Sequence, residues 1–374
     1  MNIFEVYQLW PIEPVRAKGC KIWDKEGTEY LDLYGGHAVI SIGHTHPTYC
    51  SMLKEQIGKI GFYSNAVENS LQVELAQQLG RMCGYPDYSL FLCNSGAEAN
   101  ENAMKLASFH TGKAKIIAMN KAFHGRTSGA VAATDNPKIQ APFNKTDHIV
   151  FVPVNDLQAL ENELKKEEYA ALMIEGIQGV AGIFEPQVEY LKSARELCDK
   201  YGVVLIFDEV QSGYGRTGQF FAHQQSVVKG DIITTAKGMA NGFPIGGVII
   251  SPKFKAVTGM LGTTFGGNHL ACTAALTVLK VIEDEHLINN AKIIGEYLIS
   301  HLKGNKAIKE LRGRGLMIGI ELYPEYLTLR DRLLFEKKIF TGGAGKSVIR
   351  LLPPLCISKE NADQFIDAFN DLTK

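Results

Sequence analysis

Short apolar segments alternate with longer segments of helical spacing between residues 71 and 235. The apolar runs are continuous, as expected for strands whose two faces are both covered by helices. They predict strands over Ser89–Cys93, Ile116–Met119, Ile149–Val152, Ala170–Ile174, Val203–Phe207 and Ile232–Thr235. Helical spacing predicts helices over Leu71–Met82, Glu98–Phe109, Asp156–Lys165 and Val188–Tyr201, with Asn155 as the N-cap of the third. The alternation is typical of an α/β fold with a large, doubly wound, mostly parallel sheet.

The pattern changes on both sides of this region. Before residue 50, only two short strands are predicted, Cys20–Trp23 and Tyr30–Leu33. After Asn268, a long helix is expected from about Leu270 to Leu302, followed by a strand over Leu316–Leu322, a helix over Leu327–Lys338, a strand over Val348–Leu352 and a helix over Ala362–Leu372. We therefore expect a large domain over residues 51–275 and a smaller C-terminal α/β domain over residues 276–374. Residues 1–50 would form an N-terminal arm or part of the small domain.

Composition excludes several classes of protein. Hydrophobic residues make up 45% of the 374 residues and charged residues 21%, which excludes disorder as the dominant state. No apolar run approaches the roughly 18 residues of a membrane span. The 39 basic and 40 acidic residues nearly cancel, so charge gives no case for nucleic acid or an anionic membrane as the main partner. Seven widely spaced cysteines and the absence of a leader-like N-terminus indicate a cytoplasmic protein with reduced thiols.

Glycine is over-represented, with 37 residues where ordinary usage of ~7% would give about 26. Clustered glycines are typical of turns whose backbone approaches a ligand closely. One cluster, Asn94-Ser95-Gly96-Ala97-Glu98-Ala99, follows a predicted strand and opens a helix. Free N–H groups and the positive end of the helix would make an anion site there, with a phosphate on Ser95, Gly96 and Ala97. The alternative is that Asn94 or Ser95 only caps the helix.

Two further predicted strands end in residues with reactive side chains. Asp208 follows Val203–Phe207, and an acid at a buried strand end is costly unless it meets a cation. Its alternatives are a metal or turn carboxylate, or the acid of a nucleotide hydrolase. Lys237 follows Ile232–Thr235 and is either a solvated turn residue or an amine desolvated enough to form a Schiff base.

Ligands of open parallel sheets bind at the carboxyl ends of the strands, so the three segments indicate one ligand. That ligand would need a phosphate, a cationic ring and a carbonyl, and pyridoxal 5′-phosphate has all three. Asp208 would pair with the ring nitrogen and keep it protonated. Lys237 would hold the carbonyl carbon and then move the proton during the reaction. The two are the predicted catalytic residues.

Over essentially its whole length the chain resembles the class III, fold type I pyridoxal-phosphate aminotransferases. It is most similar to the N-acetylornithine/N-succinylornithine aminotransferases. The matching stretches, in order, are Lys18-Gly19 to Trp23-Asp24, Gly43-His44 to His46-Pro47, Asn94 to Ala99, Phe123-His124-Gly125-Arg126-Thr127, Asp208-Glu209-Val210-Gln211, Lys237-Gly238, Thr263 to Asn268 and Ile349-Arg350 to Leu355. Such an ordered series is highly specific for the superfamily and less so for the subfamily.

The resemblance implies an activity and an assembly. The activity is transfer of the δ-amino group of an N-acylated ornithine to 2-oxoglutarate, giving the acylglutamate semialdehyde and glutamate, in arginine biosynthesis. The alternative is an ornithine δ-aminotransferase or another ω-amino-acid aminotransferase, such as one for 4-aminobutyrate. The assembly is a homodimer with shared active sites.

The resemblance also implies residue roles. Phe123 would stack on the cofactor ring, Gln211 would bind its phenolic oxygen, and Thr264 would reach the phosphate in the neighbouring subunit. The full cofactor-binding set is Ser95, Gly96, Ala97, Phe123, Asp208, Val210, Gln211, Lys237 and Thr264. Arg126 would bind the acylornithine carboxylate and Arg350 that of 2-oxoglutarate, because arginine clamps carboxylates through two parallel hydrogen bonds. The substrate-binding set is Arg126, Thr263, Arg350 and Glu175, and no metal is expected. The alternatives are a core position for Phe123 and an ion pair between the domains for Arg350.

The sequence departs from the family at two positions. Many relatives continue Glu-Pro-Ile-Gln-Gly-Glu where this chain reads Glu175 to Val180. The last Glu pairs with the arginine matching Arg350, so with Val180 we expect Arg350 to stay available to a substrate carboxylate throughout. Lys21 stands where ornithine δ-aminotransferases carry an aromatic residue, which favours an acylated ornithine over free ornithine.

Three other interpretations fit less well. Gly342 to Ser347 imitates a P-loop, but Phe340 stands where its first glycine belongs, and a strand follows instead of a helix. His44 and His46, one residue apart, would face opposite ways on a strand, so a turn is favoured over a metal site. A protein that binds the cofactor without turnover is disfavoured because Lys237, Asp208 and Arg126 are all present.

Overall fold

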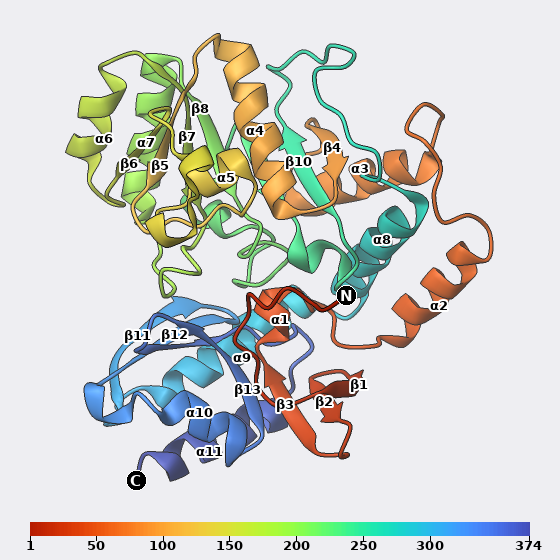
Figure 1. Ribbon diagram of the computed structural model, residues 1–374, viewed down its shortest axis with the longest axis vertical. Helices are drawn as coiled ribbons and strands as arrows, with labels where there is room; N and C mark the ends of the chain where they lie inside the picture. Colours follow the sequence, from red (N-terminus) through yellow and green to blue (C-terminus); the bar gives the residue numbers. More distant parts are fainter.

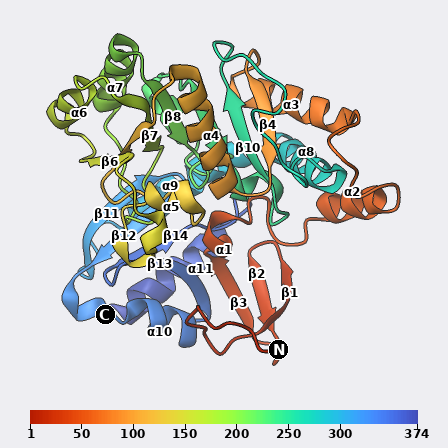
Figure 2. The same cartoon turned by 45° about the horizontal axis from the view of Figure 1, so that its top comes forward.

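The structure is a computed structural model that describes all 374 residues. It has two lobes, each built on a seven-stranded sheet (Figure 1). A second view shows the same division, with the long helix α4 (Gly96–Thr111) crossing in front of the upper sheet (Figure 2). No helix is both long enough and apolar enough to cross a membrane.

The upper sheet contains all six strands predicted between residues 89 and 235, and one more. In spatial order its strands are β4 (Ser89–Cys93), β10 (Gly246–Ile250), β9 (Ile232–Thr235), β8 (Val204–Asp208), β7 (Tyr169–Glu175), β5 (Lys115–Met119) and β6 (Ile149–Val152). Strand β10 runs antiparallel to both of its neighbours, and the other six strands are parallel. Every residue of β7, β8 and β9 is buried, as expected for strands covered on both faces. The α/β fold with a mostly parallel sheet is therefore confirmed.

Helices cover this sheet on both sides. Helix α4 contacts β7, β9 and β10, and α7 contacts β8. The helices of this lobe are α2 (Pro47–Ile57), α3 (Ser70–Cys83), α4, α5 (Ser128–Ala132), α6 (Leu157–Leu164), α7 (Val188–Tyr201) and α8 (His269–Asp284). Short 3-10 turns lie at Pro137–Ile139, Pro142–Asn144, Ala222–Ser226 and Lys237–Ala240.

The lower sheet joins the two ends of the chain. In spatial order its strands are β1 (Pro14–Lys18), β2 (Lys21–Asp24), β3 (Glu29–Leu33), β13 (Ile339–Ala344), β14 (Val348–Leu351), β12 (Met317–Leu322) and β11 (Ile308–Arg314). Strand β3 pairs with β13 in parallel, and all other neighbours are antiparallel. The remaining helical elements are α1 (Gly35–Ala38), α9 (Leu287–Leu302), α10 (Leu329–Phe335), α11 (Lys359–Leu372) and a 3-10 turn at Pro324–Tyr326. The domain boundaries at residues 50 and 275 stay a prediction.

Two sequence-based predictions are wrong in detail. The long helix expected from Leu270 to Leu302 is two helices, α8 and α9, because His286 between them adopts a left-handed backbone with φ of 52°. The N-cap of α6 is Asp156, whose side chain accepts a hydrogen bond from Ala159 N at 2.9 Å. Asn155 instead accepts one from Gln187 N at 2.8 Å. Strands β1, β10, β11 and β13 were not predicted.

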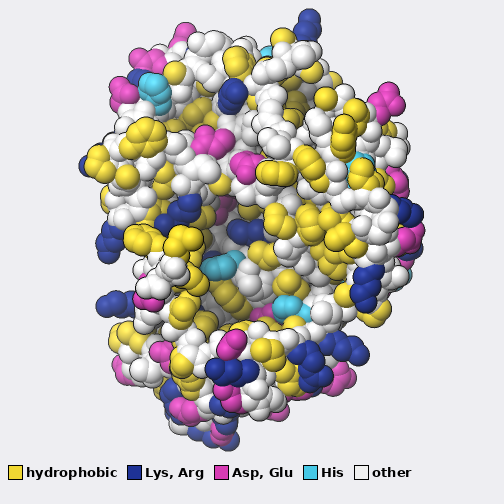
Figure 3. Space-filling model, turned by 45° about the vertical axis from the view of Figure 1, so that its right-hand side comes forward, with side chains coloured by type: hydrophobic (Ala, Val, Ile, Leu, Met, Phe, Trp, Pro, Cys, Tyr) yellow, Lys and Arg dark blue, Asp and Glu magenta, His cyan; other side chains and the backbone are white.

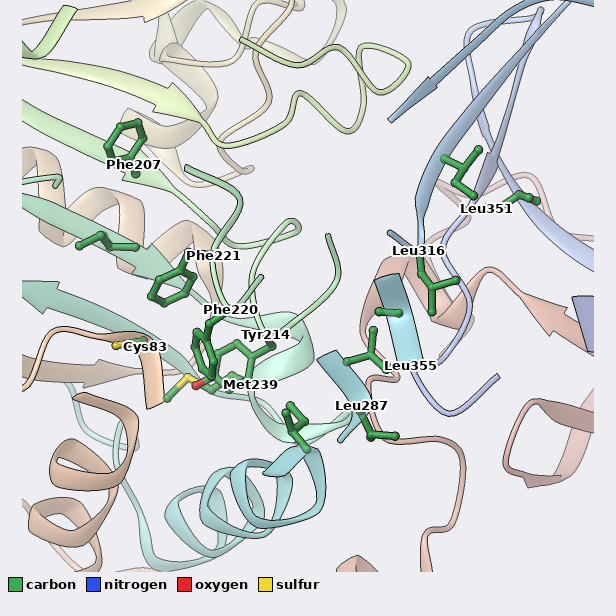
Figure 4. Close-up of a cluster of buried hydrophobic side chains, with 14 of the residues drawn as sticks. Cys83, Phe207, Tyr214, Phe220, Phe221, Met239, Leu287, Leu316, Leu351 and Leu355 are labelled. Atoms are coloured by element: carbon green, nitrogen blue, oxygen red, sulfur yellow. The ribbon is translucent and has the colours of Figure 1, made fainter. Parts of the chain in front are cut away.

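One apolar core runs through both lobes. It is a cluster of 65 buried residues that includes side chains of the upper strands and of the lower strands alike. Figure 4 shows its middle, where Tyr214, Phe220 and Met239 lie between Phe207 of β8 and Leu351 of β14. The lobes are therefore packed together through apolar contacts and are not joined by a flexible linker alone.

Candidate active site

A cavity of about 360 Å³ lies at the carboxyl ends of the parallel strands, where ligands of such sheets bind. The space-filling view shows a hollow in the middle of one face, with basic, acidic and histidine side chains around it (Figure 3). The predicted site residues that line the cavity are Ser95, Gly96, Ala97, Phe123, Arg126, Glu175, Asp208, Val210, Gln211 and Lys237. Thr263, Thr264 and Arg350 do not line it.

The turn after β4 presents a helix N-terminus to the cavity. Ser95 is the N-cap of α4, and its Oγ accepts a hydrogen bond from Glu98 N at 3.2 Å. The N–H groups of Gly96 and Ala97 lie in the first turn, where such groups have no partner within the helix. A Cβ at position 96 would lie only 2.5 Å from Cγ1 of Val210, so glycine is needed there. Capping by Ser95 and anion binding by this turn are therefore compatible.

Asp208 ends β8 at the floor of the cavity and is 4% exposed. Its Oδ2 accepts hydrogen bonds from His124 Nδ1 at 2.7 Å and Asn100 Nδ2 at 2.8 Å, and its Oδ1 accepts one from Val210 N at 3.0 Å. Burial lowers the pKa of His124, but the hydrogen bond to Asp208 and its negative charge outweigh burial and raise that pKa overall. Three donors thus hold the carboxylate in place.

Lys237 begins the 3-10 turn after β9 and lines the same cavity. Burial lowers its pKa, the carboxylates of Asp208 and Glu175 act in the opposite direction, and the net shift is downward. Because an amine is nucleophilic only when unprotonated, the lowered pKa favours attack on a carbonyl at neutral pH. Lys237 is half-buried at the start of this turn.

Glu175 ends β7 beside Asp208 and is buried. Its Oε1 accepts a hydrogen bond from Phe123 N at 2.9 Å, and its Oε2 accepts one from Gly179 N at 3.2 Å. Burial raises the pKa of Glu175 to about 7. The carboxyl therefore positions the Phe123 backbone at the cavity wall. Near pH 6, this carboxyl is mostly protonated in the folded protein and mostly ionised in the unfolded chain.

This raised pKa makes stability depend on pH. Between the ordinary pKa of a glutamate, about 4.3, and the folded value near 7, the folded state keeps a proton that the unfolded chain has released. The free energy of unfolding of the cofactor-free protein is therefore expected to fall as pH rises through this window, by about 4 kcal/mol from Glu175 alone. Glu175→Gln should remove this contribution. In urea unfolding, the free energy of unfolding of the variant should therefore rise relative to that of the wild type between pH 5 and pH 8.

Exposed Glu196 supplies the control, because Glu196→Gln should leave the pH dependence unchanged. If the free energies of unfolding of the wild type and Glu175→Gln differed by the same amount at pH 5 and pH 8, the prediction would be contradicted.

Arg350 lies in β14 just outside the cavity and is buried. Its Nη1 donates to Gly179 O at 3.1 Å and to Gln211 Oε1 at 3.5 Å, and its Nε has no hydrogen-bond partner. It forms no salt bridge, so the ion pair between domains considered as its alternative is absent. Val180, next to Gly179, is 44% exposed and lines the cavity.

The remaining predicted residues lie outside the cavity or at its edge. Arg126 is exposed at the edge of the cavity and has no hydrogen-bond or ion-pair partner within the chain. Thr263 Oγ1 accepts a hydrogen bond from Asn94 Nδ2 at 3.2 Å, which links it to a lining residue. Thr264 is exposed. Lys21 pairs with Glu29 at 2.6 Å and does not line the cavity.

Two polar residues of this site received no role from the sequence. His124 stands in a matching stretch, and Asn100 follows the Ser95 turn by one helical turn. The available signal for Asn100 is a lone amide on a helix face otherwise formed by Ala103, Met104 and Ala107, all buried. A polar side chain at such a position must find a partner, which here is Asp208.

The chemical groups around the cavity fit pyridoxal 5′-phosphate. The free N–H groups at the start of α4 suit a phosphate, and Asp208 Oδ1 has room for one more donor, such as a ring N–H. The Lys237 amine suits an aldehyde. All of these groups line one cavity, so a single molecule can meet them together.

Comparison with known proteins agrees with this description. The family model for class-III aminotransferases matches residues 5–372. An acetylornithine aminotransferase of Bacillus cereus is 40% identical, with 98% of this chain and 95% of the relative covered. One from Methanocaldococcus jannaschii is 41% identical with the same coverage.

Solved structures give the same family. An ornithine aminotransferase of Toxoplasma gondii superposes with a TM-score of 0.91 at 31% identity, covering 98% of this chain and 92% of that one. An acetylornithine aminotransferase of Elizabethkingia anophelis superposes with a TM-score of 0.87 at 30% identity, covering 99% of this chain and 95% of that one. The chain therefore belongs to the class-III aminotransferases, pyridoxal-phosphate enzymes of fold type I.

Proposed function

We propose that this aminotransferase transfers the δ-amino group of N-acetyl- or N-succinylornithine to 2-oxoglutarate, in arginine biosynthesis. The products are the acylglutamate semialdehyde and glutamate. The observation that carries the proposal is the single cavity that holds Lys237, Asp208 and the α4 N-terminus, with the unpartnered guanidinium of Arg126 at its edge. Acetylornithine aminotransferases at about 40% identity support the choice of substrate.

Each residue of the cavity has a proposed task. Ser95, Gly96 and Ala97 hold the phosphate, and Asp208 binds the ring nitrogen. Phe123 and Val210 flank the ring, and Gln211 donates to its phenolic oxygen. The bound cofactor supplies an aldehyde that condenses with amines and a ring that accepts electrons from the reacting carbon. With the cofactor bound, the Lys237 amine would be placed to take up and return the proton of the reacting carbon.

Two arginines have proposed substrate roles. Arg126 binds the carboxylate of the acylornithine, and Arg350 binds a carboxylate of 2-oxoglutarate. No acidic side chain pairs with Arg350, and Val180 supplies none at the adjacent position of the cavity wall. Arg350 is therefore ready to bind a substrate carboxylate in both half-reactions, with Glu175 and Thr263 supporting the substrate site.

We also propose that the active form is a homodimer in which Thr263 and Thr264 reach the partner's site. Ile60, Phe62 and Tyr63 are exposed, and so is Phe265, whose ring lies 5.4 Å from that of Phe62. A second copy would cover these side chains. A solution mass of two chains is the expected result in sedimentation, and a mass of one chain would contradict it.

A cytoplasmic location completes the proposal. All seven cysteines are free, which suits a reducing compartment.

The test of the substrate is stopped-flow absorbance of the cofactor-loaded protein. Separate samples receive N-acetylornithine, N-succinylornithine, ornithine and 4-aminobutyrate. Rapid bleaching of the visible band by an acylornithine, with slow bleaching by ornithine, is the expected outcome, and the faster acyl form identifies the donor. Fast bleaching by ornithine or 4-aminobutyrate alone would replace the proposal with the alternative, which the ornithine aminotransferase neighbours also fit.

The Arg126→Lys variant tests the proposed carboxylate clamp. Lysine keeps the charge but loses the planar fork, so KM for the acylornithine should rise about tenfold. Steady-state kinetics measure this, and KM for 2-oxoglutarate serves as the internal control because Arg350 is assigned to that substrate. An equal rise for both substrates, or none, would refute the role of Arg126.

A further inference from the structure

Asn100 is a buried amide in the middle of α4, and it is 1% exposed. All of its polar atoms have partners. Its Nδ2 donates to His124 O at 2.7 Å and to Asp208 Oδ2 at 2.8 Å, and its Oδ1 accepts from Thr234 Oγ1 at 2.6 Å. Thr234 lies in β9 and has no exposed surface. A fully satisfied polar network of this kind fixes one arrangement of its members.

The partners determine which way the amide points. If Asn100 were flipped, its oxygen would face two acceptors, the Asp208 carboxylate and the His124 carbonyl. The NH₂ group must therefore face Asp208, and the oxygen must face Thr234. In this orientation the Thr234 hydroxyl acts as the donor, so Thr234 stabilises the orientation that Asp208 needs.

The network connects three elements that meet at the cavity. Asn100 lies on the helix whose first turn forms the anion site, Asp208 ends β8, and Thr234 lies three residues before Lys237 at the end of β9. With Asn100 and His124 bound to Oδ2, and the Val210 N–H bound to Oδ1, the carboxylate cannot rotate without losing hydrogen bonds. Its remaining acceptor capacity lies on Oδ1.

We propose that Asn100, oriented by Thr234, is a positioning residue that keeps the Asp208 carboxylate aimed at the ring nitrogen of the cofactor. The inference rests on the proposed role of Asp208. A carboxylate held at the ring nitrogen would keep that nitrogen in its protonated, electron-accepting form. Neither Asn100 nor Thr234 lines the cavity, so both act through the lining residues that Asn100 holds, Asp208 and His124.

The test uses four variants of the full-length protein. Thr234→Val removes the hydroxyl while nearly preserving volume, Thr234→Ser restores it, and Asn100→Ala removes the amide. Asn102→Ala is the control, because this asparagine lies on the same helix and donates only to the backbone at Glu98 O, at 2.8 Å. The readouts are the Kd for pyridoxal 5′-phosphate, from titration of cofactor-free protein, the rate of bleaching by the best amino donor, and the urea midpoint of the cofactor-free protein.

The expected result is a graded loss. Thr234→Val should raise Kd and slow bleaching, each by about tenfold. Asn100→Ala should have a larger effect on both, because it removes a hydrogen bond to a carboxylate, and hydrogen bonds to charged groups are the stronger ones. Thr234→Ser should restore wild-type values, and Asn102→Ala should match the wild type. The inference would be overturned if Thr234→Val and Asn100→Ala kept the wild-type Kd and the wild-type rate of bleaching. It would also be overturned if these variants had lower urea midpoints but an unchanged Kd. Bleaching by 4-aminobutyrate alone would overturn the proposed substrate but leave this inference standing.

Discussion

Replacing Lys237 with alanine is expected to abolish multiple-turnover transamination, with a loss of at least about 10⁴-fold in kcat. The lysine has two tasks, because its amine forms the bond to the cofactor and also moves the proton in the reaction. Its lowered pKa suits both tasks near neutral pH. The measurement is steady-state formation of glutamate from 2-oxoglutarate with an acylornithine as donor.

The control for this variant is Lys105→Ala, which removes an exposed lysine of α4 and should leave kcat unchanged. Multiple turnovers by Lys237→Ala at a rate near that of the wild type would show that the assigned mechanism is wrong.

Replacing Asp208 with asparagine is the second substitution with a large expected effect. The side chain keeps its shape but loses the negative charge that would hold the ring nitrogen protonated. The amino-donor half-reaction should slow by about 10³-fold, and cofactor binding should weaken. His124 would also lose the carboxylate that raises its pKa, so the variant should contain a neutral imidazole. Stopped-flow bleaching gives the rate, and titration of the cofactor-free protein gives the affinity.

Asp87→Asn is the matched control because Asp87 is exposed and lies away from the cavity. An Asp208→Asn variant that bleaches at the wild-type rate would contradict the role of Asp208.

The large sheet and the centre of the site could be predicted because their signals are local. Each strand is a continuous apolar run, and the strands of a parallel sheet all bring their carboxyl ends to one edge. Ser95, Asp208 and Lys237 each stand within two residues of the end of such a run, so the topology brings them together. The cavity confirms this arrangement.

Other elements gave weak signals. Strand β10 begins with two glycines, and β11 reads Ile-Lys-Glu-Leu-Arg-Gly-Arg, so neither carries the apolar run of a covered strand. The break between α8 and α9 lies among charged residues that also fit the exposed face of one long helix. Asn155 and Asp156 are both common N-cap residues, and only their contacts distinguish them.

Contacts between distant segments could not be predicted, because they leave no local signal in the sequence. Asn100 and Asp208 are separated by 108 residues, and nothing local to either shows that their side chains meet. The position of Arg350 beside Gly179 is likewise a product of packing between the lobes. The sequence could name the acid and the lysine but not the side chains that hold them.

The buried cluster that includes both Phe207 and Leu351 couples the stability of the two lobes. If one lobe unfolds, the apolar surface that the other lobe packs against it becomes exposed to water. A destabilising change in the lower lobe, far from Lys237, therefore lowers the amount of active enzyme as directly as one beside the cavity.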